Sequence, residues 1–303
     1  MTNFRKVIIY GHKLNSLESH THAFEHHLYW KTFRIMGYET LWVDEYDDLS
    51  GLDLSNCLFV TIGGASNRIP LRKDCKYIVH NPEDRKYDEV IDNVLVNQIY
   101  SKEIKSREVE VLYEPFYFER KNSSGYKTLY HPWCSDVDPT EVKHFSTSEI
   151  LQNRQKVVNF VGTVYPPGEW SNIKELQDLD KACSIKYASP LRISKAVGQA
   201  HIDLMRSSFI APAVQGRKSC ELQLGVSRPY KIASYGRVPC TNSRHVFEVL
   251  EGFAGYSSSI EEAVERTVAL EESMTDLQYK QMVNLVTSKY SYRNQVEVML
   301  SLL

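Results

Sequence analysis

Short runs of apolar, β-branched residues recur along the chain, and longer segments of mixed polarity separate them. Five of these runs fall within the first 100 residues, at residues 6–11, 39–44, 57–63, 76–81 and 93–100. Runs of this length, flanked by turn-forming residues, are typical of buried strands. The alternation predicts an α/β fold on a parallel sheet, in which ligands bind beyond the carboxyl ends of the strands.

The first half of the chain predicts one domain. A helix from about Ser19 to Met36, closed by Gly37, joins the first two strands and gives a βαβ opening. Residues 108–133 differ, because they form two extended segments around a turn at KNSSG. We place the domain boundary soon after this segment and expect an N-terminal Rossmann-like domain over residues 1–145.

The second half repeats the class of the first half without repeating its sequence. Strands are expected at residues 157–163, 184–188, 209–215 and 238–242, and helices from about 171, over about 194–206 and over 227–236. Two later helix starts have the S/T-x-x-E/Q spacing of a capping box, Ser259 with Glu262 and Thr275 with Gln278. Residues 146–303 thus predict a second Rossmann-like domain with C-terminal helices that are free to pack back on the first. Together the halves predict two doubly wound domains facing a cleft.

The stretch SRPYKIASYG, residues 227–236, predicts a helix that carries cations at its N-terminus. Pro229 suits the first turn and Gly236 suits the left-handed residue that follows the helix. Arg228 and Lys231 then lie where free amide N–H groups are already positive, at a typical cost of ~0.3–1 kcal/mol. A bound phosphate or diphosphate removes this conflict. The alternative is that both are solvated surface charges.

Two further segments fall at expected carboxyl ends of strands in the same domain. Gly162 and Thr163 follow one strand, and Gln215 follows another. With the helix start at Pro229 they are expected to line one crevice. The phosphate site is not a P-loop or a dinucleotide fingerprint, because neither G-K-[ST] nor G-x-G-x-x-G is present.

The net charge and the cysteine content limit the binding partners and the cellular locations that we expect. A net charge of −2 gives no case for a nucleic-acid binder. No apolar stretch approaches ~20 residues, so no transmembrane segment is expected, although peripheral membrane contact stays open. Six cysteines without a CxxC pair argue against a structural zinc site and favour reduced thiols in the cytoplasm.

The segment SHTHAFEHH concentrates histidines near the start of the first predicted helix. His22 and His26, at i and i+4, could both ligate a metal ion, but the sequence shows no third ligand and no HExxH motif. We therefore predict no metal. His26 shares the apolar arc of the helix with Tyr29 and Phe33 and is expected to be a partly buried, satisfied histidine.

Several segments, taken in order, resemble one enzyme group. HPWCSDVDPTEV is similar to the interdomain segment of small bacterial and viral glycosyltransferases of the GT-B architecture. NFVGT, HIDLMRSSFIAPAVQG and RPYKIASYGRVPCTNS resemble the second domain of that group, as SHTHAF and GYETLWVDE resemble its first. The resemblance implies two facing Rossmann-like domains, a nucleoside-diphosphate sugar bound by the second domain, and transfer without a metal or other cofactor.

One motif of the group is missing. Many retaining members have two glutamates, eight positions apart, that contact the sugar and the ribose. Counting back from Gly236 places Gln223 and Lys231 at these positions, and Glu221 is the nearest acid. The stereochemistry of transfer and the ribose contact are therefore left open.

The resemblance also assigns candidate residues. On the acceptor side, Glu18, His20 or His22 would accept the proton of the attacking hydroxyl. The other acceptor-side candidates are His12, His80 and Asn81; the donor candidates are Gly162, Thr163, Gln215, Glu221, Arg228, Lys231, Tyr235, Asn242 and Ser243. Structural alternatives remain, since His20 could cap the helix, His80 and Asn81 could form a turn, and Tyr235, Asn242 and Ser243 could pack.

The sequence thus predicts a cytoplasmic glycosyltransferase that moves a sugar from a nucleoside-diphosphate sugar to a saccharide or glycolipid. Two alternatives stay open. One is a nucleotide-sugar-binding protein without transfer activity, and the other is a GT-B-like sugar-nucleotide epimerase.

Overall fold

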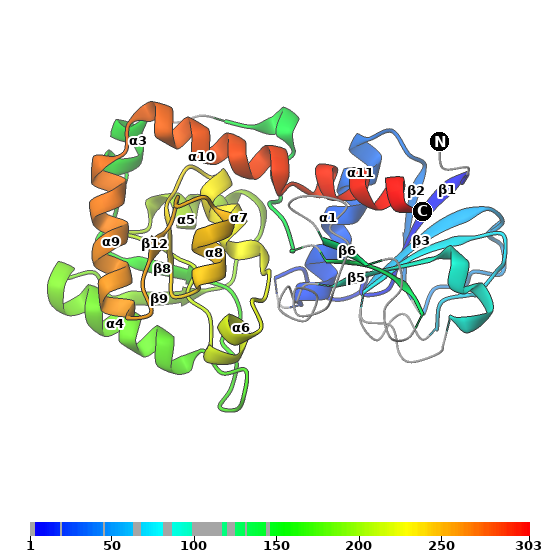
Figure 1. Cartoon of the computed structure of the whole chain (residues 1–303), viewed down its shortest axis with the longest axis horizontal. Coiled ribbons are helices and arrows are strands. Elements are labelled where there is room, and N and C mark those ends of the chain that lie inside the picture. The colour runs from blue at the N-terminus through cyan, green and yellow to red at the C-terminus, as the bar shows by residue number, and fades with distance from the viewer. Residues whose placement is uncertain are drawn as a thin grey trace. The chain divides into compact units, whose positions relative to one another are not determined.

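The computed structural model describes residues 4–18, 20–44, 46–62, 68–80, 87–98, 117–119, 125–130, 132–143 and 146–303. By its internal contacts the chain divides into two compact units (Figure 1). Unit 1 comprises Met1–Trp133 and Tyr292–Leu303, and unit 2 comprises Cys134–Ser291. The boundary expected after residue 145 therefore lies inside unit 2, and the last helix belongs to unit 1.

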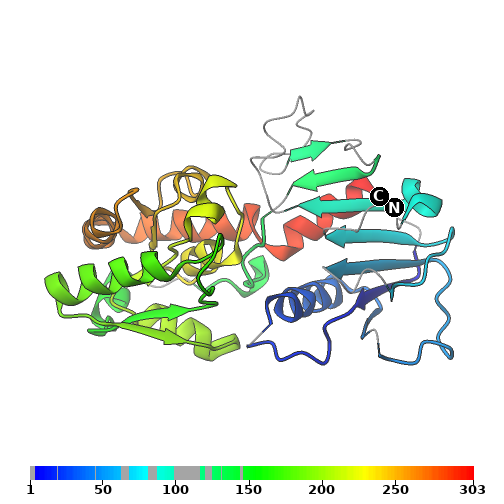
Figure 2. The same ribbon diagram turned by 90° about the horizontal axis from the view of Figure 1, so that it is seen from below.

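Unit 1 is built on a mainly parallel sheet. In the described part, its strand order is β2-β1-β3-β4-β5-β7-β6. The strands are β1 (Lys6–Tyr10), β2 (Thr40–Val43), β3 (Cys57–Ile62), β4 (Lys76–His80), β5 (Val94–Gln98), β6 (Tyr117–Glu119) and β7 (Lys127–Tyr130). Only the outer strand β6 runs antiparallel to its neighbour (Figure 2). The five strands predicted from apolar runs are confirmed.

Helices cover one face of this sheet. Helix α1 (Thr21–Ile35) packs on β1, β2 and β3, and α11 (Tyr292–Leu302) packs against α1. Tyr29 fixes the two helices, because its hydroxyl donates to Gln295 Oε1 at 3.0 Å and its ring meets Tyr292 edge-on. Gln295 in turn donates to the Pro132 carbonyl at 2.7 Å.

The opposite face of the sheet departs from the doubly wound expectation. In the described part of unit 1 it is covered by the 3-10 helix η2 (Asp88–Asn93) and by loop residues such as Leu49, Leu52 and Leu71, which pack on the buried side chains of the strands. The connection after β2 forms turns instead of a helix, because aspartate side chains accept bonds from backbone N–H groups two residues on.

Unit 2 contains a second parallel arrangement. Its strands are β8 (Val158–Val161), β9 (Leu191–Ser194), β10 (Ala211–Pro212), β11 (Pro239–Thr241) and β12 (Gly255–Tyr256). The pairs β8–β9, β10–β11 and β11–β12 are all parallel, and β8 lies beside β10. The carboxyl ends of β8, β10 and β11 therefore lie at one edge.

Helices cover both faces of the unit 2 sheet, as predicted. One core joins the strands to α4 (Ile173–Tyr187) and α9 (Ile260–Ser273), and the other joins them to α5 (Gly198–Ser207) and α7 (Ser227–Ser234). The remaining helices are η3 (Pro139–Glu141), α3 (Thr147–Gln152), α6 (Arg217–Glu221), α8 (Arg244–Val249) and α10 (Asp276–Lys289). Among the described residues, no helix is both long enough and apolar enough to cross a lipid bilayer.

One predicted strand is wrong. Residues 184–188 form the end of α4, with Ala188 as a left-handed C-cap, and the strand follows at Leu191–Ser194. The apolar residues Leu176, Leu179 and Cys183 are buried at helical spacing, and this longer pattern overrides the short aromatic run. The helix expected from residue 194 correspondingly begins at Gly198.

The two predicted capping boxes have different outcomes. At Thr275 the box is complete, with both reciprocal hydrogen bonds present. Ser259 caps α9 through its side chain, but the Glu262 carboxylate bonds Ser257 Oγ and Arg266. Ser259 is therefore confirmed as the N-cap of α9. The Glu262 side chain bonds Ser257 and Arg266 in place of the Ser259 backbone.

Unit 2 is also held by a fully buried ion pair. Arg237 and Glu271 are both 0% exposed, and the guanidinium donates to both carboxylate oxygens at 2.8 and 3.0 Å. Arg237 donates further bonds to four backbone carbonyls, those of Met205, Arg206, Ser208 and Phe209. Each charge thus has the partners that burial requires.

Candidate functional site

Helix α7 has the predicted form. It begins at Ser227, Pro229 lies in its first turn, and Gly236 follows it with φ of 79°. Its N-cap residue is Val226, which makes no side-chain capping bond. The first amide groups of this helix thus have no side-chain cap, and a helix N-terminus of this kind favours an anion.

Arg228 lies across the ends of two neighbouring strands. Its Nε donates to the Val161 carbonyl at 3.3 Å, Nη1 approaches the Val214 carbonyl at 3.5 Å, and the guanidinium stacks 4.2 Å from the centre of the Phe160 ring. Burial lowers the pKa of Arg228 to about 10, so the group stays charged at neutral pH. In the described part of the chain no carboxylate pairs with it, and an anionic ligand would supply that partner.

Gly162 allows Arg228 this position. Its φ is +156°, and a Cβ placed on it would lie 2.1 Å from Arg228 Nη2. A side chain at this position would therefore displace the guanidinium. The requirement explains why glycine follows β8, where the sequence analysis placed a donor contact.

Two further basic groups lie beside Arg228. Lys231 is 5% exposed, and His201 on α5 is 7% exposed. Burial, and after it the positive charge of Lys231, lowers the pKa of His201 to about 4. Among the described residues, His201 Nε2 has no hydrogen-bond partner. A buried polar atom without a partner is costly unless a ligand binds it.

Tyr235 and Asp136 form a pair in the same neighbourhood. The Tyr235 hydroxyl donates to the Asp136 carboxylate, with its oxygen 2.7 and 2.8 Å from the two carboxylate oxygens, and burial raises the pKa of Tyr235 well above its usual value. The His201 ring meets Tyr235 edge-on at 5.8 Å. The Tyr235 hydroxyl is thus engaged with Asp136, and its contact with a donor stays a prediction.

Asn242 hydrogen-bonds the segment that follows β10 to the segment that follows β11. Its side-chain oxygen accepts from Gln215 N at 2.9 Å and its amide donates to Gln215 O at 2.8 Å. Ser243 caps α8. The side-chain amide of Gln215 is buried, and neither of its polar atoms has a hydrogen-bond partner among the described residues. Gln215 is therefore the member of this group that best fits a ligand contact.

The other two donor candidates are exposed. Thr163 follows Gly162, and its carbonyl accepts from the Asn172 amide at 3.1 Å. Glu221 lies on α6, where it pairs with Arg217 at 2.6 Å. Their donor contacts stay predictions.

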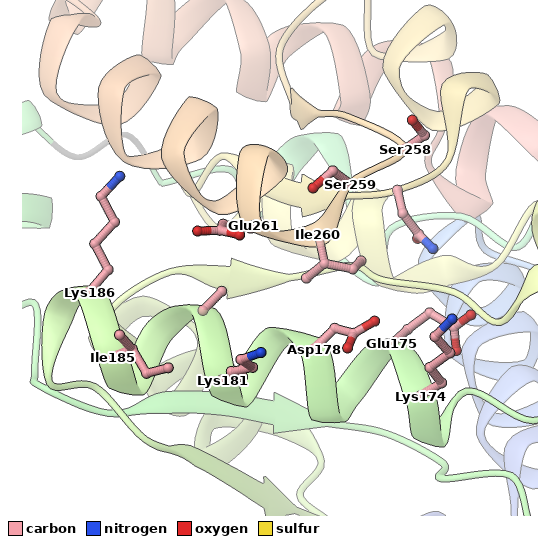
Figure 3. Close-up of a pocket in the computed structure, with 12 residues that line it drawn as sticks. Lys174, Glu175, Asp178, Lys181, Ile185, Lys186, Ser258, Ser259, Ile260 and Glu261 are labelled. Carbon is pink, nitrogen blue, oxygen red and sulfur yellow. The ribbon is translucent and has the colours of Figure 1, made fainter.

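A surface pocket of about 370 Å³ lies between α4 and the start of α9 (Figure 3). Its lining includes Asn242, one of the donor candidates. Three lysines (Lys174, Lys181, Lys186) and three acids (Glu175, Asp178, Glu261) also line it. Because these charges balance, the pocket does not by itself select an anion.

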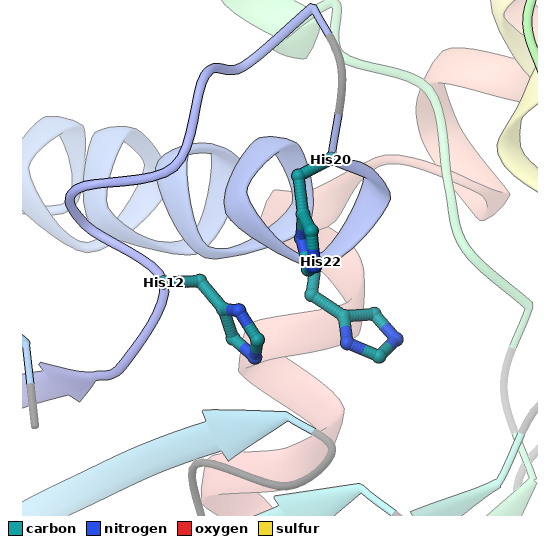
Figure 4. Close-up of side chains that lie close together, drawn as sticks. All are labelled: His12, His20 and His22. Carbon is teal, nitrogen blue, oxygen red and sulfur yellow. The ribbon is translucent and has the colours of Figure 1, made fainter.

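In unit 1 the predicted acceptor-side histidines come together. His20 is the N-cap of α1, with Nδ1 accepting from Ala23 N at 3.4 Å, and His22 lies in the first turn. His12, on the loop after β1, stacks on His20 at 4.6 Å between ring centres and meets His22 at 5.2 Å (Figure 4). Burial, followed by the charges of His80, His12 and His20, lowers the pKa of His22 to about 4.

The surroundings of this group are aromatic. Trp133 lies 6.3 Å from His22 and 6.1 Å from His80, measured between ring centres. His80 ends β4, and its Nδ1 lies 3.1 Å from the Asn97 carbonyl. Glu18 is exposed on the loop before α1. Asn81 lies outside the described residues.

His26 is buried, but it is fully buried where partial burial was predicted. Among the described residues neither of its ring nitrogens has a hydrogen-bond partner, so the prediction of a satisfied histidine is wrong. Burial, and then the charge of His12, lowers its pKa well below the usual value. The i, i+4 pair of His22 and His26 is not the closest grouping, because His12, His20 and His22 are the residues whose ring nitrogens converge. His12, the third member of this group, lies on a loop, and the helical pattern used in the sequence analysis did not include that loop.

Three residues near Arg228 were missed from the sequence as site residues. Phe160 stacks on the guanidinium, Asp136 accepts a hydrogen bond from Tyr235, and His201 has a ring nitrogen without a hydrogen-bond partner in the described part of the chain. Asp136 lies within the HPWCSDVDPTEV segment, which offered a signal. His201 and Phe160 carry none, because their positions depend on how α5 and α7 pack on β8.

Comparison with solved structures finds two complexes of an α-glucosyltransferase. One, with UDP and a 13-mer DNA containing an HMU base, has a TM-score of 0.59 at 7% identity and covers 99% of this chain and 99% of that chain. The other, with UDP and a 13-mer DNA containing a central A:G mismatch, has a TM-score of 0.50 at 10% identity and covers 98% and 99%. No protein-family model matches the sequence, and neither does any curated protein.

The chain therefore shares the fold of this α-glucosyltransferase, in agreement with the glycosyltransferase fold that its sequence resembles. At identities this low the likeness concerns the fold alone.

Proposed function

We propose that this protein is a glycosyltransferase that moves a sugar from a nucleoside-diphosphate sugar to a saccharide or glycolipid acceptor. The observation that carries the proposal is Arg228, a charged guanidinium at the carboxyl ends of β8 and β10 with no carboxylate partner among the described residues. A diphosphate would neutralise it, together with Lys231 and the uncapped start of α7. The fold it shares with a UDP-bound α-glucosyltransferase supports this assignment.

In the proposed mechanism unit 2 binds the donor and stabilises the leaving diphosphate. Two cations and the helix N–H groups supply the positive charge, so the transfer needs no metal. His201 Nε2 and the Gln215 amide are additional groups that can donate to the donor. Direct transfer requires both substrates to meet, so the facing arrangement of the units remains part of the proposal.

Unit 1 is proposed to bind the acceptor. His20, His22 or Glu18 accepts the proton of the attacking hydroxyl, a contribution of typically ~10²–10⁴-fold. His12 and His80, and Asn81 beyond the described residues, are proposed to contact the acceptor. The free thiols of all six cysteines support a reducing, cytoplasmic location.

One further class of acceptor should be tested beside saccharides and glycolipids. Both solved α-glucosyltransferase structures contain DNA. The net charge of −2 favours saccharide or glycolipid acceptors, and we keep this preference. A DNA duplex carrying a hydroxymethylated base belongs in the panel, because transfer to it would overturn the exclusion of nucleic acid.

The test is incubation with UDP-, GDP- and CMP-sugars, with and without candidate acceptors, while free nucleotide and glycosylated product are measured. We expect release that depends on an acceptor and persists in EDTA. Binding without turnover would favour a nucleotide-sugar-binding protein, and interconversion of donor sugars without an acceptor would favour an epimerase. His20→Ala, His22→Ala or Glu18→Gln should lower the transfer rate while UDP affinity stays unchanged.

A further inference from the structure

Three histidines of unit 1 form a grouping that the transfer reaction does not require as a set. One ring nitrogen from each of His12, His20 and His22 lies within 4.8 Å of the other two. The distances between their ring centres are 4.6, 5.2 and 5.5 Å. Figure 4 shows His12 arriving from the loop after β1, and His20 and His22 from the start of α1.

We propose that His12, His20 and His22 form a binding site for a single divalent transition-metal ion of the zinc class. The inhibitory role argued below rests on the proposed function, whereas the binding itself does not. Imidazole nitrogens suit zinc, cobalt, nickel and copper, whereas magnesium and calcium prefer oxygen ligands. Three histidines leave a fourth position for water or another ligand.

The backbone directs His12 into this grouping. His12 has φ of +59°, a left-handed conformation that is uncommon in residues with a side chain. The loop is fixed around it, because Gly11 N donates to the Val43 carbonyl at 2.8 Å and Trp42 Nε1 donates to the Gly11 carbonyl at 3.0 Å. Strain of this kind persists where surrounding contacts impose it, and it concentrates at binding sites.

The hydrogen bonds of the second ring nitrogens are compatible with a metal. Asn15 Nδ2 lies 3.2 Å from His12 Nδ1, and rotation of this amide lets its oxygen accept a hydrogen bond from Nδ1–H while Nε2 ligates. His20 Nδ1 accepts from Ala23 N at a long 3.4 Å. Ligation through His20 Nε2 moves the ring proton to Nδ1 and gives up this weak cap, without moving the helix.

The site closes by a small movement. A tetrahedral ion with bonds of about 2.0–2.1 Å holds its nitrogen ligands roughly 3.3 Å apart, so the nitrogens must approach by about 1 Å or more. Side-chain rotation supplies this, since His20 and His22 lie at a helix start and His12 lies on a loop.

Metal binding and acceptor activation compete for the same lone pairs. An imidazole that donates its nitrogen to a metal ion cannot accept the proton of a hydroxyl. With His20 or His22 as the base, the ion would therefore inhibit transfer, and a chelator would restore it; with Glu18 as the base, zinc would bind without this competition.

The binding is tested directly on the full-length, tag-free protein after removal of metals with EDTA. Calorimetric titration with zinc at pH 7.5, in a buffer that does not bind metals, should give one ion per chain. Cobalt should develop the intense visible absorption of tetrahedral coordination. His12→Ala, His20→Ala and His22→Ala should each weaken zinc binding by about tenfold or more.

The matched control is His27→Ala, on the same helix but outside the trio. It should bind zinc like the parent, and circular dichroism should show that all four variants are folded. Absence of stoichiometric zinc binding, or equal affinity in the parent and the three trio variants, would overturn the site. Zinc binding by a protein that shows no transferase activity even after metal removal with EDTA would instead overturn the proposed function and leave the metal site standing.

Discussion

Unit 2 contains two arginines that face the low dielectric of the interior in opposite ways. Arg237 has a carboxylate partner in Glu271 and four carbonyl acceptors, all within 3.2 Å. Arg228 has two longer carbonyl contacts and an aromatic ring, with no carboxylate in the described part of the chain. The first has its partners within the fold, and an anion is the partner that we propose for the second.

This difference distinguishes a charge that the fold itself pairs from a charge that we propose to pair with a ligand. Arginine side chains do not lose their charge in proteins, so a guanidinium removed from water needs hydrogen-bonding or charged partners. The histidines of unit 1 resolve the same problem differently, because burial leaves His22 and His80 neutral. We therefore propose that Arg228 pairs with an anion, whereas the neutral imidazole of His22 is proposed to accept a proton or a metal ion.

The largest effect is expected at the satisfied pair. Glu271→Ala leaves Arg237 buried without its carboxylate, and the free energy of unfolding should fall by about 3–5 kcal/mol. Urea denaturation at pH 7.5 measures this change. Glu265→Ala, which removes the exposed partner of Lys186, is the control and should cost about 1 kcal/mol or less. Equal stability of the two variants would contradict a structural role for the buried pair.

The second effect is expected at the unsatisfied arginine. Arg228→Met removes a charge that the empty protein does not pair, so stability should be retained while UDP affinity falls by about 1.5–3 kcal/mol, or roughly 10- to 150-fold. Calorimetry with UDP measures the affinity. Lys231→Ala should weaken binding similarly, and Lys231→Glu should weaken it further because it repels the diphosphate. Unchanged UDP affinity in Arg228→Met and Lys231→Ala would remove the case for an anion site.

The third effect concerns pH. His201 has a folded pKa of about 4 against an ordinary value of 6.5, so the unfolded chain binds its proton first. Its contribution to stability is complete above pH 6.5 and is lost as the pH falls toward 4. Between pH 7.5 and 5.5 this histidine should cost about 1 kcal/mol of unfolding free energy.

The His201→Gln variant isolates this contribution. Its loss of unfolding free energy between pH 7.5 and 5.5 should be smaller than that of the parent by about 1 kcal/mol. Parallel pH profiles for parent and variant would show that His201 titrates normally and is not the buried neutral group described above.

The smallest effect is expected beside Arg228. Gly162→Ala places a Cβ where the guanidinium lies, so UDP affinity should fall by several-fold, on the order of 1 kcal/mol. Gly168→Ala is matched, since Gly168 has φ of +153° and nothing within 4 Å of its added Cβ. Both variants share the backbone strain, and only the first displaces Arg228. Equal UDP affinities would show that the close approach does not matter for binding.

The parts of the fold that the sequence predicted correctly depend on residues that are close in sequence. The apolar runs located the strands of unit 1, and Pro229 with Gly236 located α7, because both depend on residues close in sequence. The strand expected at residues 184–188 failed because the burial of Leu179 and Cys183 on α4 decided the structure there. Tertiary packing overrides short local preference in such cases.

The candidate sites divide in the same way. Arg228 was predicted from its helix position, but its contact with Phe160 and the free nitrogen of His201 depend on long-range packing. The grouping of His12 with His20 and His22 depends on a left-handed residue in a loop. No periodic pattern encodes such a conformation, so the sequence favoured the i, i+4 pair instead.

The assignment of α11 to unit 1 has a consequence for biosynthesis. Unit 2 is a continuous segment, Cys134–Ser291, so it can fold once it has left the ribosome. Unit 1 must wait for Tyr292 and Gln295, which follow unit 2 in the chain and which complete the contacts of Tyr29. Until then the side of α1 that carries Tyr29 lacks its partner helix, and apolar surface exposed in this way during synthesis favours aggregation.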